Sequence, residues 1–232
     1  MHTFRFMYNY IKVNIINSEY ETQSHFDNMM SLLVKHGESI AADTLLDVGC
    51  NKGVRSIAVA KALGIAHQNI HGVDIEDITN DSPLSRNNFK KMDLEDGLLP
   101  YDDNSFGLVI CNQVMEHLKN YNRIFQEIIR VTKLDGFIVL GIPNLAHLMN
   151  RILLLSGTQP MCMIMRSGHV RGFTHKAFLE FLHSQSPVKL IDCKGSSIIY
   201  PLPYVLAKPL SNIFTGLCAY TCYLIQKNSD HD

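Results

Sequence analysis

From residue 43 to residue 144 the chain alternates short apolar runs with stretches whose apolar residues recur at helical spacing. The apolar runs are TLLDV at 44–48, NIHGVDI at 69–75, FGLVICN at 106–112 and DGFIVLGIP at 135–143. Helical stretches lie at 54–64 and 121–132, and one face of the second carries Ile124, Phe125, Ile128 and Ile129. Strands that are apolar on both faces, separated by amphipathic helices, indicate a parallel sheet covered on both sides. The pattern predicts a doubly wound α/β fold.

The two ends of the chain follow a looser pattern. A helix is expected over 19–36, with Phe26, Met30 and Leu33 as its apolar stripe. Beyond Asn144 we expect helices at 145–155 and 174–184, the second begun by Thr174, strands at 188–200 and 219–227, and a proline-containing surface excursion at 201–217. We predict one domain over 1–232, made of a helical lead-in (1–40), a core (41–144), an insertion (145–186) and C-terminal strands (187–232).

Composition narrows the class of protein. The 232 residues are 46% hydrophobic and 19% charged, with a formal net charge of -1, so broad electrostatic attraction to nucleic acid is not expected. Apolar runs stay shorter than the roughly 18 residues of a membrane span, so no transmembrane segment is expected. The six cysteines show no C-x-x-C spacing, which is typical of reduced thiols. We predict a cytoplasmic monomer or homodimer.

The stretch LLDVGCNKGVRS, residues 45–56, places a glycine turn between the first strand and the first helix. It lacks the G-x-x-x-x-G-K-[ST] pattern of a phosphate-binding loop and the G-x-G-x-x-G pattern of a dinucleotide site. Asp47, two residues before Gly49, would repel a pyrophosphate but suits a ligand that carries ammonium and sulfonium charges. S-adenosylmethionine is such a ligand.

Four motifs in order, spanning about 45–144, resemble those of class I S-adenosylmethionine-dependent methyltransferases of the methyltransferase type 11 kind. They are LLDVGCNKG, HGVDIED, KKMDLEDGLLPYDDNSFGLVICNQVMEHL and RVTKLDGFIVLGIPN. The resemblance implies a Rossmann-like, mostly parallel sheet of seven strands with helices on both faces. It also implies S-adenosyl-L-methionine as the cofactor and methylation as the reaction.

The resemblance implies ten cofactor-binding residues: Asp47, Gly49, Cys50, Asn51, Gly53, Asp74, Ile75, Asp93, Leu94 and Asn112. The residues of the glycine turn match the loop that holds the methionine part of the cofactor. Asp74 matches the carboxylate that accepts the ribose hydroxyls, and Asp93 matches the acid that receives the adenine amino group, with the Leu94 backbone N–H donating. Asn112 would end a strand beside the methyl group. Asn51 departs from the family's usual glycine, although asparagine tolerates left-handed backbone better than most residues.

The residues after 112 bear on the acceptor. CNQVMEH lacks the N-P-P-Y or D-P-P-Y loop of enzymes that methylate nucleobase amino groups. Glu116 and His117 resemble the metal-binding E-x-x-E-H stretch of ubiquinone-pathway O-methyltransferases, but Gln113 replaces the first acid. Because a hard cation prefers several oxygen ligands, we predict no metal site.

The segments IPNLAHLMNRILLLSGTQP and SGHVRGFTHKAFLEFL resemble a subgroup of bacterial and archaeal methyltransferases, some of which sit among genes for cell-surface glycans. In that fold the insertion covers the cofactor and shapes the acceptor pocket. Candidate catalytic or acceptor-binding residues are His117, His147, His169 and Arg171. Arg171 could equally be a structural clamp to a nearby acid.

We expect methyl transfer to a small-molecule, lipid or glycan-type acceptor at oxygen, although the sequence does not choose between oxygen, nitrogen and carbon. The alternatives are a non-catalytic binding or regulatory protein that keeps the cofactor fold, and a nicotinamide-dependent oxidoreductase. Asp47 and the missing second glycine disfavour the oxidoreductase.

Overall fold

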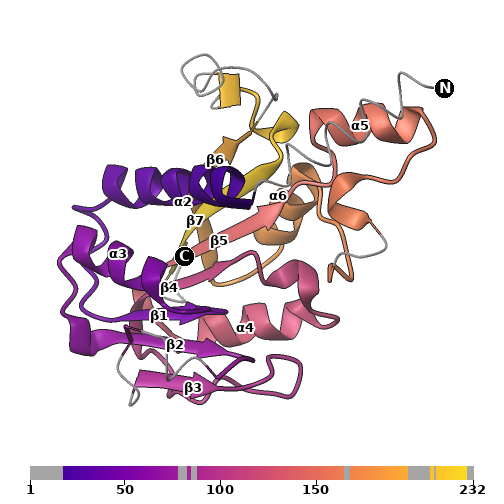
Figure 1. The fold of residues 1–232 in the computed structure, drawn as a ribbon. Coiled ribbons are helices and arrows are strands. Elements are labelled where there is room, and N and C mark those ends of the chain that lie inside the picture. The colour runs from indigo at the N-terminus through magenta and orange to yellow at the C-terminus, as the bar shows by residue number, and fades with distance from the viewer. Residues whose placement is uncertain are drawn as a thin grey trace.

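The computed structural model of the chain describes residues 18–77, 83–84, 88–164, 168–197, 210–211 and 213–228. Seven strands in these ranges form one sheet (Figure 1). They are β1 Leu45–Val48, β2 Ile70–Asp74, β3 Phe89–Lys91, β4 Phe106–Asn112, β5 Thr132–Pro143, β6 Val188–Ser196 and β7 Tyr220–Lys227. The expectations for residues 1–17 and for most of the 201–217 excursion lie outside the described residues.

The strand order is β3-β2-β1-β4-β5-β7-β6. The pairs among the first five of these strands are parallel, whereas β7 runs antiparallel to both β5 and β6. This mostly parallel sheet of seven strands is the predicted fold class, which is confirmed.

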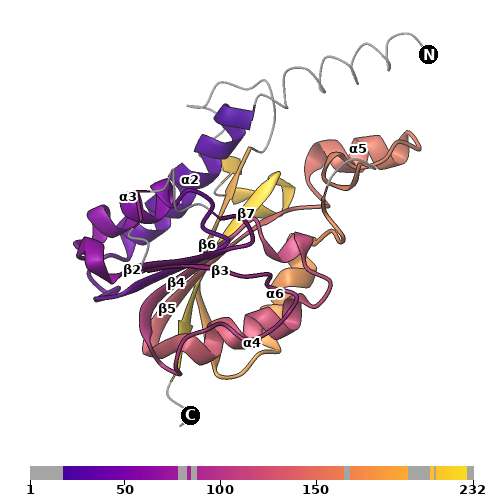
Figure 2. The ribbon, with the colours of Figure 1, turned by 60° about the horizontal axis from the view of Figure 1, so that its bottom comes forward.

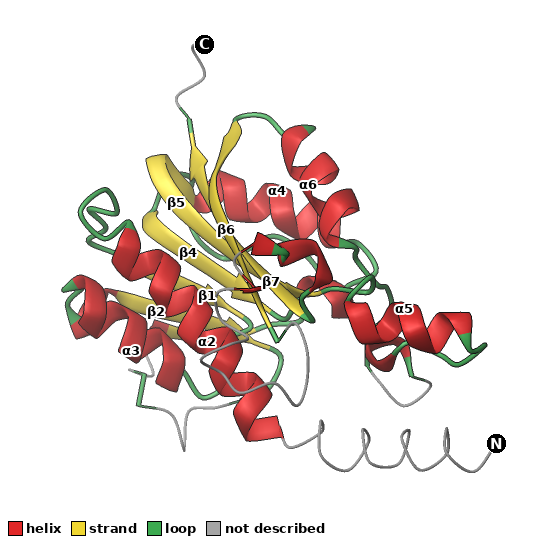
Figure 3. Ribbon diagram, turned by 90° about the horizontal axis from the view of Figure 1, so that it is seen from above, coloured by secondary structure: helices red, strands yellow, loops and turns green. Residues whose placement is uncertain are grey.

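Helices cover both faces of the sheet (Figure 2). The α-helices in the described residues are α2 Ser18–Lys35, α3 Val54–Leu63, α4 Tyr121–Val131, α5 Leu148–Leu155 and α6 His175–His183. Apolar residues of α2 and α3 belong to one hydrophobic core, and those of α4 and α6 belong to another on the opposite face. The four residues predicted on one face of α4 are all buried. Figure 3 shows α5 set apart from these layers.

Successive side chains of the central strands contribute alternately to the two hydrophobic cores. Along β4, Leu108 and Ile110 belong to the core beneath α2 and α3, whereas Val109 and Cys111 belong to the core beneath α4 and α6. Successive side chains of a strand point to opposite faces, so a continuously apolar strand serves two layers at once. This explains why the sequence of β4 shows no polar alternation.

Local signals mark the boundaries of two helices where the sequence predicts them. Gly64, in the left-handed region at φ 72°, ends α3. The Thr174 side chain accepts a hydrogen bond from the Ala177 N–H and thereby caps the start of α6. Side-chain caps of this kind satisfy one of the free N–H groups at a helix start.

Hydropathy alone does not reveal two local details. The three-residue strand β3 carries two lysines and sits at the edge of the sheet, so it shows no apolar run. In α3 the buried residues are Ser56, Val59 and Ala60, while Val54 is exposed. The polar Ser56 faces inward because it meets a buried carboxylate, which hydropathy cannot reveal.

Candidate active site

The glycine turn joins the carboxyl end of β1 to α3 and lies against β2. Gly49, Asn51 and Gly53 all have positive φ, at 76°, 46° and 71°. The N–H groups of Gly49 and Cys50 donate to the Val73 carbonyl oxygen at 2.9 and 3.1 Å. The left-handed backbone expected of Asn51 is confirmed, and the turn is held directly above the end of β2.

Asp74 ends β2 beside this turn. Its Oδ2 accepts the Asn51 N–H at 2.7 Å, and its Oδ1 accepts the Glu76 N–H at 3.1 Å. Two backbone donors orient the half-buried carboxylate, and each oxygen keeps a further lone pair. A fixed, accessible carboxylate at this point fits a pair of ribose hydroxyls. Ile75, the next residue, is exposed.

Asp47 stands at the other side of the turn, within β1. It is 6% exposed, and its Oδ2 accepts the Ser56 hydroxyl at 2.5 Å. Burial raises the pKa of Asp47 to about 6, and the nearby charge of Asp74 adds to the rise, while Ser56 and Arg55 oppose it. A buried carboxylate with few compensating charges favours a cationic ligand. The ammonium group of S-adenosylmethionine fits this requirement.

Asp93 and Leu94 follow β3 on the same edge of the sheet. The Met92 N–H donates to the Asp74 carbonyl oxygen at 2.8 Å, which ties this loop to the end of β2. Asp93 Oδ1 accepts the Glu95 N–H at 2.9 Å, and Leu94 is buried. The three acids that the sequence selects thus lie in or beside neighbouring strands β1, β2 and β3.

The loop after β4 meets the glycine turn. A Cβ atom added at Gly49 would collide with Val114 Cγ2, so the two loops touch. Asn112 ends β4, with its Oδ1 lying over Gly141 of β5 so closely that a Cβ at 141 would overlap it. Gln113 then turns at φ 59° and donates its N–H to the Gly141 carbonyl oxygen at 2.8 Å. Strands β1 and β4 are the neighbours at which the chain reverses its direction across the sheet, where ligands of such folds bind.

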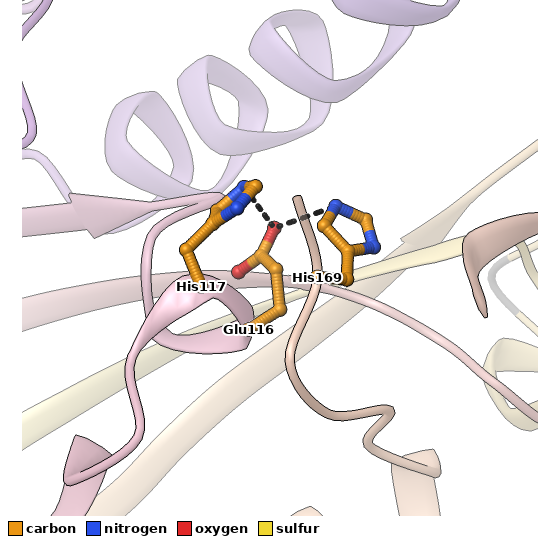
Figure 4. Close-up of side chains that lie close together, drawn as sticks. All are labelled: Glu116, His117 and His169. Atoms are coloured by element: carbon orange, nitrogen blue, oxygen red, sulfur yellow. Dashed lines mark ion pairs between the residues drawn. The ribbon is translucent and has the colours of Figure 1, made fainter. Parts of the chain in front are cut away.

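A second group of polar side chains follows β4. The 3-10 helix η3, Met115–His117, carries a fully buried Glu116, and burial raises the pKa of that carboxyl to about 8. Figure 4 shows the Glu116 carboxylate between the rings of His117 and His169, with Oε1 at 4.0 and 3.9 Å from their Nε2 atoms. Residues 168–171 reach η3 because the Val170 and Arg171 N–H groups donate to the Glu116 carbonyl oxygen at 2.9 and 3.3 Å.

The two remaining candidates, Arg171 and His147, are not part of the group formed by Glu116, His117 and His169. The Arg171 guanidinium donates to the carbonyl oxygens of Leu118 and Lys119 at 3.1 and 2.5 Å and lies 4.4 Å from the centre of the Tyr121 ring. It therefore clamps the loop after η3, through carbonyl groups and a ring rather than an acid. His147 precedes α5 and is half-buried, and burial lowers its pKa to about 4.

Buried Asn144 sets the path of the chain between β5 and α6. Its side-chain NH2 donates to the carbonyl oxygens of Gly216 and Cys218 at 3.0 and 2.8 Å, while its Oδ1 accepts the N–H groups of Ala146 and His175. Residues 144 and 173 also form an isolated bridge. Both ends of the 145–173 segment are therefore fixed at the carboxyl end of β5.

The sequence gives no sign that Glu116 and His169 are neighbours, but the structure brings the two side chains together. No spacing rule connects them, because they belong to segments that meet only through the hydrogen bonds between 168–171 and η3. The available signal was a lone acid inside an otherwise apolar stretch, VMEHL, directly after a buried strand. A buried acid in such a place requires partners from elsewhere in the chain.

The strand order, the glycine turn and the acids beside β1, β2 and β3 define a class I S-adenosylmethionine-dependent methyltransferase domain. Residues 46–140 match the family model described as a methyltransferase domain.

Two relatives are named as methyltransferases, and a solved structure shares the fold. The chain is 24% identical over 154 residues to a ubiquinone biosynthesis O-methyltransferase of Hydrogenovibrio crunogenus, covering 63% of this chain and 60% of the relative. It is 29% identical over 140 residues to a demethylmenaquinone methyltransferase of Shouchella clausii, covering 56% of this chain and 57% of the relative. A Thermotoga maritima S-adenosylmethionine-dependent methyltransferase, described as a possible histamine N-methyltransferase, superposes with a TM-score of 0.58 at 16% identity, covering 91% and 96% of the two chains. The matches thus span about 60% of the length of the two relatives.

Among the helices that the structure describes, each is too short or too polar to cross a membrane.

Proposed function

We propose that this chain transfers the methyl group of S-adenosylmethionine to an oxygen atom of a small-molecule acceptor. The observation that carries the proposal is the arrangement around the glycine turn. A buried acid stands on one side of that turn, and an oriented acid accepts the Asn51 N–H on the other. These two carboxylates suit the cationic and the hydroxylated parts of the same ligand.

When bound, S-adenosylmethionine supplies an electrophilic methyl carbon on its sulfonium sulfur. The protein then has to hold the two reactants in line and exclude water, and such positioning can lower a reaction barrier by about 7–11 kcal/mol. Asp74 would hold the ribose and Asp47 the ammonium group. Asn112 and the loop after β4 would face the methyl group, because β4 is the strand beside β1.

The segment 145–186 is proposed as the acceptor-side cover within a single domain. It leaves the sheet at the carboxyl end of β5 and returns to η3 through residues 168–171. His117 and His169 are proposed to contact the acceptor, because their side chains are 44% and 20% exposed beside this edge. His147 and Arg171 are less favoured, since Arg171 is held by two backbone carbonyl oxygens.

An aromatic hydroxyl on a quinone-related ring is the acceptor that the relatives favour. One is named for O-methylation in ubiquinone biosynthesis, and another is named for methylation of demethylmenaquinone. The second name keeps carbon as an alternative acceptor atom. A lipid acceptor that carries such a ring falls within the proposal, whereas a glycan acceptor has no support among these relatives.

A turnover assay with labelled methyl donor tests the proposal. Purified protein is incubated with S-adenosylmethionine and a panel of catechols, hydroquinones, quinone precursors and glycans, and S-adenosylhomocysteine is quantified. Methylation of a phenolic oxygen is expected, and mass spectrometry of the product separates oxygen from carbon methylation. Binding of the cofactor without turnover on any acceptor of the panel would favour the non-catalytic alternative.

A further inference from the structure

The cluster of Glu116, His117 and His169 differs from an ordinary set of surface side chains. Each residue offers one ligand atom, and these atoms all lie within 4.8 Å of one another. Glu116 is fully buried, and neither of its carboxylate oxygens has a hydrogen-bond donor within the described part of the chain. A buried carboxylate without a donor or a cation is costly, so the site calls for a positive partner.

The two histidines present the correct nitrogen to such a partner. His117 Nδ1 lies 3.0 Å from the Gly168 carbonyl oxygen, and His169 Nδ1 lies 2.6 Å from the Cys162 carbonyl oxygen. Because a carbonyl oxygen only accepts, each Nδ1 carries the hydrogen. In the neutral ring Nε2 then keeps its lone pair. Metal-binding histidines characteristically donate their second ring N–H to a carbonyl or carboxylate in this way.

The separations leave room for an ion. The two Nε2 atoms are 4.0 and 3.9 Å from Glu116 Oε1, which is too long for a hydrogen bond. Ligand atoms around a tetrahedral zinc ion with bonds of about 2.0–2.1 Å stand about 3.3–3.4 Å apart. To reach this spacing, Glu116 Oε1 and each Nε2 atom would have to approach by about 0.6 Å. Both rings are fixed by their Nδ1 contacts, so the site is largely formed in advance.

The ligand set selects the type of metal. Two imidazole nitrogens and one carboxylate oxygen suit zinc and similar transition metals, whereas magnesium and calcium prefer oxygen ligands. Three protein ligands leave a coordination position open, as in catalytic rather than structural zinc sites. The side chain of His117 is 44% exposed, so the open position can be reached from solvent.

From this geometry we infer that Glu116, His117 and His169 form a three-ligand binding site for a divalent transition metal, zinc above all. The site joins the loop after β4 to residues 168–171, and a bound ion would fix the two segments together. The site shares His117 and His169 with the acceptor side of the proposed function, but zinc binding is measured without methyl donor or acceptor, so failure of one proposal is distinguishable from failure of the other.

Metal titration tests the site directly. The tag-free protein of 232 residues is stripped with a chelator and titrated with Zn²⁺ by calorimetry, with Mg²⁺ as the hard-cation comparison. One Zn²⁺ per chain is expected, together with a rise in melting temperature and no comparable effect of Mg²⁺. Cobalt serves as the spectroscopic probe, and its visible absorption should show a site of low coordination number with nitrogen ligands.

Three variants locate the binding. Glu116→Gln and His169→Gln should each lower zinc affinity by at least about 100-fold, because loss of even an outer-shell partner costs about 10–100-fold. His183→Gln, which removes an exposed histidine at the end of α6, should leave affinity unchanged. Titration with S-adenosylhomocysteine is run on every variant, and unchanged affinity is expected.

Several outcomes would overturn the site. These are absence of stoichiometric zinc binding to the unaltered protein, retention of binding in both ligand variants, and equal loss in His183→Gln. If a ligand variant fails to fold, the cobalt spectrum and the zinc-dependent melting temperature of the unaltered protein still decide. Lack of both signals rejects the site.

Discussion

The Asn51 N–H donates to Asp74 Oδ2 at 2.7 Å, so the turn after β1 and the acid at the end of β2 form one structural unit. The left-handed backbone of Asn51 at φ 46° aims this N–H at the carboxylate. The same contact orients the acid for a ligand and stabilises the turn. Because Asp74 is only half-buried, a change there should affect cofactor binding more than folding.

Asp74→Ala should weaken binding of S-adenosylhomocysteine by about 1.5–3 kcal/mol, because a charged acceptor for two hydroxyls is lost. Isothermal titration calorimetry measures this change, and circular dichroism should show an unchanged fold. Glu76→Gln, which alters an exposed acid in the same loop, is the matched control. Unchanged affinity in Asp74→Ala with a loss in Glu76→Gln would move the ribose contact to Glu76.

Asp47 should make cofactor affinity depend on pH. Burial raises its pKa to about 6, so the free protein holds a proton on this carboxyl below that pH. A cationic ligand favours the carboxylate and expels the proton. Affinity for S-adenosylhomocysteine should therefore rise from pH 5 to pH 7 and then level off, and Asp47→Asn should lose the dependence. A parallel slope in Asp47→Asn would assign the effect to another group.

Asp47 should also make the stability of the free protein depend on pH. Because the folded-state pKa of Asp47 is raised, the folded state binds more protons than the unfolded state between about pH 4 and pH 6. The contribution of Asp47 to the free energy of unfolding is thus present at low pH and is lost as pH rises through 6. Denaturant unfolding of the unaltered protein and Asp47→Asn is compared at about pH 4.5, within this window, and at about pH 7, above it. The free energy of unfolding of the unaltered protein should fall relative to that of Asp47→Asn at the higher pH.

Gly49→Ala should destabilise the fold by about 1–3 kcal/mol, through backbone strain at positive φ and overlap with the Val114 side chain. Val114→Ala in the same chain should recover part of the loss, since it removes Cγ2 but leaves the strain. Chemical denaturation of the four members of this double-mutant cycle measures the coupling. Strictly additive effects would show that the two loops do not press on each other.

Arg171→Ala should lower the melting temperature by about 2–4 °C, equivalent to about 1 kcal/mol for a chain of this size. The reason is the loss of two hydrogen bonds to backbone carbonyl oxygens and of the contact with the Tyr121 ring. Arg171→Lys should not restore it, because lysine lacks the planar fork that serves both carbonyls. A large fall in turnover at an unchanged melting temperature would instead place Arg171 at the acceptor.

The sequence by itself determined the doubly wound core and the conformation of the glycine turn. Continuous apolar strands, helical spacing and the turn from Asp47 to Gly53 are local signals, because period and backbone conformation are encoded within a few residues. The conformation of Asn51 and the buried face of α4 followed from such signals alone. The resemblance to methyltransferases supplied the seven strands.

Tertiary structure alone decided which side chains meet between the loop after β4 and residues 168–171. Glu116 meets His169, and Arg171 closes on the carbonyl oxygens of Leu118 and Lys119, through contacts between segments far apart in the chain. Such contacts depend on where Asn144 and η3 fix the two ends of the intervening segment, which no local period records. The inward turn of Ser56 has the same origin, because its partner Asp47 lies on a different element. Burial then sets the pKa values of Asp47 and Glu116, since desolvation depends on the whole fold around a carboxyl group.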